Sequence, residues 1–224
     1  MRALYLAVLP LVGCASASST QDLMGDAHPP IDAHGTGTDG SPHADAALHD
    51  GASVDTPTGS CTTPASGVLA TWSFTGQPGS QTSTTAASAA TGINAGAITR
   101  ASGLTAVAAA NSMDSSGWAT TAQPDSAKFY TLTITPHAGC ALDLTSLAID
   151  ALKSGSGPAS GSVATSADAF VGSTPVSTSA PSTPALSVSG ATGAVELRIY
   201  GYAAVATSGT LRLQNTLTVS GSQH

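Results

Sequence analysis

Short runs of alternating apolar and polar residues, each ended by a turn rich in Gly or Pro, are the feature that most constrains the fold. The clearest run is 128–135, where Tyr130, Leu132 and Ile134 alternate with threonines before a Pro-His-Ala-Gly turn. Similar runs occupy 68–74, with Trp72 on the apolar side, and 195–200. A period of two is that of a half-buried strand, so we expect an all-β domain with Trp72 in its core.

The strand spacing favours a single antiparallel β-sandwich, of the jelly-roll or lectin-like type. Between Cys140 and Ile149 the apolar phase changes at Thr145-Ser146, which predicts a β-bulge. A helix is the local alternative at Leu104–Met113, because three consecutive alanines, 108–110, favour helical structure.

Composition divides the chain near Cys61. Residues 15–60 contain seven acidic residues, no Lys or Arg and almost no large apolar side chains. Such a segment cannot bury enough surface to offset its chain entropy, so we expect residues 14–60 to form a disordered spacer. Residues 61–224 hold six acidic and five basic side chains and are long enough for one domain. This near-neutral domain has no basic patch, so we expect no nucleic-acid partner.

The N-terminal residues 1–13 have the pattern of an export signal, with Arg2 followed by an apolar segment. The end of this segment together with the cysteine that follows it, Leu11-Val12-Gly13-Cys14, resembles the lipobox of bacterial lipoproteins. The resemblance implies diacylglycerol on Cys14 and attachment to the membrane through lipid, and Ala15 in the following position implies the outer membrane. The alternative is ordinary cleavage after Ala15-Ser16-Ala17, which would release a free secreted protein.

Two cysteines remain, Cys61 and Cys140. An exported compartment is oxidising, so we expect them to form a disulfide that closes a loop of about 80 residues. Two buried free thiols are the alternative.

Metal ligands are sparse, and we expect no cofactor. The spacer carries four histidines among its acidic residues, which suits weak, adventitious binding of Zn, Ni or Cu without a framework to fix geometry: His28, His34, His43 and His49. In the domain, Asp168 and Phe170 follow a Ser/Thr-rich run and suggest a loop ordered around structural Ca²⁺, although the EF-hand spacing is absent.

No catalytic constellation is visible, so we expect a protein that is not an enzyme. The domain has two histidines, His137 and His224, and Ser156 lacks the spacing of a nucleophile elbow. The candidate ligand face consists of residues that carry an aromatic ring or a cation: Trp118, Arg198, Tyr200 and Tyr202. For Arg198, a cross-strand ion pair with Glu196 is the favoured alternative to ligand binding.

Several short motifs follow one another along the domain, among them Trp72-Ser73-Phe74-x-Gly76, Ser166-x-Asp168-x-Phe170 and Glu196-x-Arg198-Ile199-Tyr200-Gly201-Tyr202. They resemble an uncharacterised domain of secreted bacterial proteins that often carry PEP-CTERM or other surface-anchor signals. The resemblance implies an extracellular sandwich and brings no established activity. We therefore expect a lipid-anchored cell-envelope protein that binds polysaccharide or an envelope or protein partner. A hydrolase of surface polysaccharide and a purely structural surface protein are the alternatives.

Overall fold

The computed structural model of this protein describes residues 60–224. The expected signal peptide, Cys14, most of the spacer and the histidines at 28, 34, 43 and 49 lie outside the described residues.

The predicted alternation is seen in two neighbouring strands of one sheet. In β9 (Phe129–Thr135) the residues Tyr130, Leu132 and Ile134 are buried, and every other residue is partly exposed. In β15 (Val195–Ala204) Val195, Leu197 and Ile199 are buried in the same way. The apolar side of each strand therefore faces the core, as the sequence predicted.

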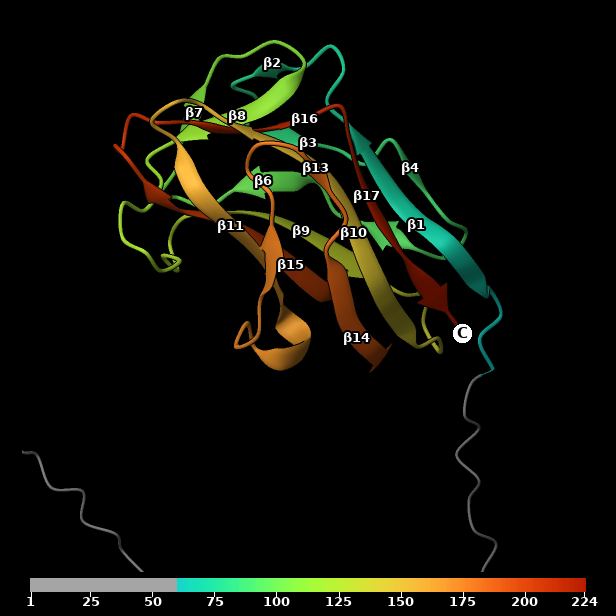
Figure 1. Cartoon of the computed structure of the whole chain (residues 1–224). Helices are drawn as coiled ribbons and strands as arrows, with labels where there is room; N and C mark the ends of the chain where they lie inside the picture. The colour runs from blue at the N-terminus through green and yellow to red at the C-terminus, as the bar shows by residue number, and fades with distance from the viewer. Residues whose placement is uncertain (1–59) are drawn as a thin grey trace, which may run out of the picture. The chain divides into compact units, whose positions relative to one another are not determined.

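Eight antiparallel strands define the topology (Figure 1). The first sheet orders β1 (Ala65–Ser73), β17 (Thr216–Gln223), β10 (Leu142–Lys153) and β14 (Ala185–Ala191). The second orders β9, β15, β11 (Pro158–Thr165) and β12 (Thr174–Val176). Counted along the chain, these strands run first-eighth-third-sixth in one sheet and second-seventh-fourth-fifth in the other. This is the order of a jelly roll, and it confirms the expected fold class.

Short strands extend both sheets, and a single 3-10 turn, η1 (Ser166–Asp168), follows β11. The first sheet gains β2 (Pro78–Gly79), β4 (Ser88–Ala89), β7 (Thr105–Val107), β8 (Ser112–Ser116), β13 (Pro181–Ser182) and β16 (Leu211–Gln214). The second gains β3 (Ser83–Thr84), β5 (Asn94–Ala95) and β6 (Ile98–Arg100). The predicted bulge in β10 is confirmed by a shift of register between Leu144 and Ser146.

The helix considered for Leu104–Met113 is absent, and two strands occupy that segment. β7 and β8 pair antiparallel, and Asn111 between them adopts a left-handed conformation with φ 58°. The backbone N–H groups of Ala109 and Asn111 donate to the carbonyls of Pro78 and Gln77. These longer-range bonds replace the local bonds that a helix would need.

Side chains from both sheets fill the core. Trp72 and Trp118 are fully buried, and their indole N–H groups donate to the carbonyls of Gly96 and Ser115, at 3.0 and 2.7 Å. The Tyr130 hydroxyl lies 2.7 Å from the Leu211 carbonyl oxygen and 3.1 Å from that of Met113, so it ties β9 to the first sheet.

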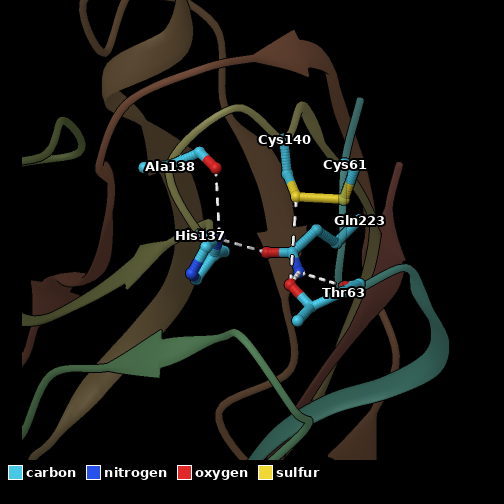
Figure 2. Close-up of a disulfide and its surroundings, with 6 residues drawn as sticks. All are labelled: Cys61, Thr63, His137, Ala138, Cys140 and Gln223. Carbon is cyan, nitrogen blue, oxygen red and sulfur yellow. Dashed lines mark hydrogen bonds between the residues drawn. A yellow bond between two sulfur atoms is a disulfide. The ribbon is translucent and has the colours of Figure 1, made fainter. Parts of the chain in front are cut away.

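A disulfide between Cys61 and Cys140 confirms the predicted pairing (Figure 2). Beside it, the buried Gln223 amide donates to the Thr63 carbonyl and hydroxyl oxygens and accepts from the His137 backbone N–H at 2.8 Å. These contacts join the segment before β1, the turn before β10 and the end of β17. These contacts therefore hold together the neighbouring strands β1, β17 and β10 of the first sheet at the end where the domain begins.

Candidate functional site

The side of β15 that faces away from the core carries Glu196, Arg198, Tyr200 and Tyr202. Among these, Tyr200 is buried, with 7% of its surface exposed. The register places Tyr200 between Phe129 on β9 and Ser162 on β11. The structure therefore brings three of the four predicted ligand-face residues, Arg198, Tyr200 and Tyr202, to one face of the second sheet.

Arg198 lies between two aromatic rings. Its guanidinium carbon is 3.8 Å from the centroid of Phe170 and 4.5 Å from that of Phe129, and Phe129 packs edge-on against Tyr200 at 5.6 Å. We call these four residues the aromatic–arginine cluster. Cation–π contacts of this kind hold the guanidinium plane in place.

The charge of Arg198 is paired on its own strand. Its Nε donates to Glu196 Oε1 at 2.8 Å, and Thr131 Oγ1 donates to the same oxygen at 2.9 Å. The predicted ion pair between Glu196 and Arg198 is therefore present, but it joins two residues of the same strand rather than two neighbouring strands. The bond from Arg198, followed by that from Thr131, lowers the pKa of Glu196, and the bond to Glu196 raises the pKa of Arg198.

Two loops rise beside the cluster and enclose a depression of about 260 Å³ on the outer face. One loop precedes β9, and the other joins η1 to β12. We call the concave region between these loops the outer-face depression. Its lining residues are Gln123, Pro124, Ser126, Ser162, Ala164, Phe170, Val171, Ser173 and Tyr200. A second depression shares Ala164 and Ser173 with it.

The loop after η1 holds an unusual backbone. Ala169 and Phe170 have φ of 57° and 62°, in the left-handed region that costs energy for side chains other than Gly. Asp168 Oδ2 accepts from the Gly172 N–H at 2.8 Å, and Val171 at the tip is 87% exposed. The loop therefore keeps a strained turn that places Phe170 over Arg198 and Val171 in solvent.

One residue that lines the outer-face depression, Ser162, has a buried hydroxyl. Ser162 is 2% exposed, and its Oγ has no hydrogen-bond partner. An unpaired buried polar group costs free energy, so such groups are uncommon and their positions are informative.

The prediction that Trp118 belongs to the ligand face is wrong. Trp118 is fully buried and packs edge-on against Tyr130, with ring centroids 5.3 Å apart, so it belongs to the core. Phe129, Phe170 and Ser162 were not predicted for the site. Two sequence features could have pointed to the aromatic residues: Phe129 lies on the polar side of its alternating run, and Phe170 follows the Ser/Thr-rich run. No sequence feature pointed to Ser162.

A separate cleft of about 160 Å³ lies on the first sheet, lined by Asp114, Leu152, Lys153, Ser154, Thr210 and Arg212. Asp114 on β8 is opposite Arg212 on β16 and is 4% exposed. Burial raises the pKa of its carboxyl, while the bond that Oδ1 accepts from the Ser115 N–H at 2.8 Å acts in the opposite direction.

Within residues 60–224, no group of three or more His, Cys, Asp or Glu side chains is arranged to hold a metal ion. No helix in this part of the chain is both long enough and apolar enough to cross a membrane.

Comparisons with protein-family models, with curated proteins and with solved structures each gave no match to this chain.

Proposed function

We propose that this protein is a lipid-anchored cell-envelope protein whose jelly roll binds an envelope polysaccharide without catalysis. The observation that carries the proposal is the outer-face depression, which lies on the outer face of the second sheet and is bordered by the aromatic–arginine cluster. Ligand sites are concave, with aromatic and apolar walls and a few polar groups that fix orientation. Sugar rings present an apolar face for stacking and hydroxyls for hydrogen bonding, which suits this lining.

The anchor is proposed from the lipobox resemblance at Cys14. Two or more acyl chains attach a protein stably, whereas one attaches it only marginally. Labelling of cells with a radioactive or clickable fatty acid tests this: label should enter the wild-type protein and be absent from Cys14→Ala. Intact mass should show a modified N-terminal Cys14, and an unlipidated chain that starts at Ser18 would refute the anchor.

A glycan array with the purified full-length protein tests the binding function. Val171→Asp places a charge on the exposed tip of the depression and should abolish the array signal. Val205→Asp is the matched control, because Val205 is 77% exposed and does not line the depression. Equal binding by both variants would show that the depression is not the site. No binding by wild type to any envelope glycan would favour a purely structural protein.

A hydrolase is the second candidate, because Asp114 is a buried carboxylate with a raised pKa in a cleft. Glycoside hydrolases use two carboxylates, and in the described domain the residues that line this cleft include only one. Release of reducing ends from envelope polysaccharide that is lost in Asp114→Asn and kept in Asp150→Asn would establish this activity.

A further inference from the structure

We infer that the outer-face depression takes an uncharged, hydroxyl-rich sugar ring, one hydroxyl of which bonds to Ser162 Oγ. The inference rests on the proposed glycan-binding function and specifies the chemical class of the ligand. Its three supports are the charge of the lining, the unpaired hydroxyl of Ser162 and the construction of the loop that carries Phe170.

The lining of the depression is polar in part but carries no ionisable cation or carboxylate among its described residues. Arg198, the cation of the aromatic–arginine cluster, is bonded to Glu196 and stacked against the rings of Phe129 and Phe170, and Lys128 is paired with Asp125. An acidic or basic sugar would lose water here without gaining a counter-charge, which is costly. Neutral hydroxyls can instead bond to Gln123 and serine side chains, while ring C–H groups contact Phe170 and Val171.

Ser162 gives the depression a specific polar contact. Its Oγ is shielded from solvent and makes no bond within the domain, so the unliganded protein bears the cost of that unpaired group. A ligand hydroxyl that reaches Oγ removes this cost. Sites that bond a substrate hydroxyl in this way reject analogues that lack it.

Ser162 Oγ is shielded from solvent, so a ligand hydroxyl reaches it only when a neighbouring part of the lining shifts. The backbone N–H groups of residues 169–171 donate to carbonyls of Thr165, Ser166 and Asp168, and that of Gly172 donates to the Asp168 side chain. All four bonds therefore stay inside 165–172. The backbone N–H groups of this wall of the depression are thus bonded within their own loop and leave Ser162 Oγ unpaired beside it.

The test measures binding of the full-length protein by isothermal titration calorimetry. The neutral probes are hexasaccharides of glucose and of mannose with different linkages, and the charged probes are oligogalacturonate and chitosan oligomers. We expect binding to at least one neutral probe and none to the charged ones. Ser162→Ala should raise the Kd for that neutral probe about tenfold, the equivalent of about 1.4 kcal/mol for one hydrogen bond.

Ser160→Ala is the matched control. Ser160 lies on the same face of β11, opposite Tyr202, and does not line the depression, so its Kd should stay within about twofold of wild type. Removal of an unpaired hydroxyl should leave the melting temperature of Ser162→Ala unchanged or higher, so a fold defect would be recognised.

The outcomes separate the two proposals. If a glycan binds and Val171→Asp abolishes binding, but Ser162→Ala has no effect or a charged probe binds best, the proposed function stands and this inference is overturned. If no probe and no envelope glycan binds, both are overturned.

Discussion

Removal of the Cys61–Cys140 disulfide should lower the free energy of unfolding by about 4.5 kcal/mol. The two cysteines are 79 residues apart, and the chain-entropy relation for a loop of roughly that length gives this value at 25 °C. The folded state should persist without the bond, because the Gln223 amide still joins Thr63 to the His137 backbone. The effect therefore acts mainly through the unfolded chain, which gains conformational freedom.

The assay is urea unfolding of Cys61→Ser/Cys140→Ser against wild type, followed by tryptophan fluorescence. Trp72 and Trp118 are the two tryptophans of the chain, and both are fully buried. The melting temperature should fall by roughly 10–15 °C, and the m-value should rise because the uncrosslinked unfolded chain exposes more surface. Wild type unfolded under strong reductant is the control and should match the variant. A loss below about 1 kcal/mol with unchanged m would refute the reasoning.

Two further outcomes concern the core and the second sheet. Tyr130→Phe should lower the free energy of urea unfolding by about 1–3 kcal/mol, because it removes the buried hydroxyl that lies within hydrogen-bond distance of the Met113 and Leu211 carbonyls. Tyr202→Phe, on the outer face, should change it by less than about 0.5 kcal/mol, and equal effects would contradict this account of Tyr130. Glu196 has a pKa below its ordinary 4.5 in the folded state, so its contribution to stability is complete above that pH and fades as the pH falls through the lower folded value. Glu196→Gln should therefore be less stable than wild type at pH 7, with the difference shrinking in acid, as urea midpoints measured from pH 7 to pH 3 would show; a difference independent of pH would exclude the ion pair as its cause.

Local patterns were enough to predict β1, β9, β15 and the bulge in β10, whereas β11, β12 and β14 were not predicted. The alternation around Tyr130 predicts a buried and an exposed side for β9 because the strand period is a local property. The segment 104–113 was open to two interpretations for a physical reason: its alanines favour a helix, but bonds to Pro78 and Gln77, more than 25 residues away, stabilise strands and a turn at Asn111.

The candidate site depended on contacts that local patterns do not contain. Arg198 and Tyr200 were predicted from the chemistry of their side chains, a cation and an aromatic ring. Their neighbours Phe129 and Phe170 come from strand pairing and from a strained loop, and these depend on the order of strands in the sheet. Trp118 was misplaced because it lies after β8, outside any alternating run that would show which way it faces.

The position of the disulfide also determines how the domain would respond to mechanical load. A pull applied at Ser60 meets Cys61 before it reaches β1, whose pairing with β17 begins at Ala65. Because Cys61 is covalently joined to Cys140, tension passes to a residue two positions before β10, a strand with neighbours on both sides. The disulfide therefore keeps the force from separating β1 from β17 one hydrogen bond at a time, and it transmits the load to an interior strand of the sheet.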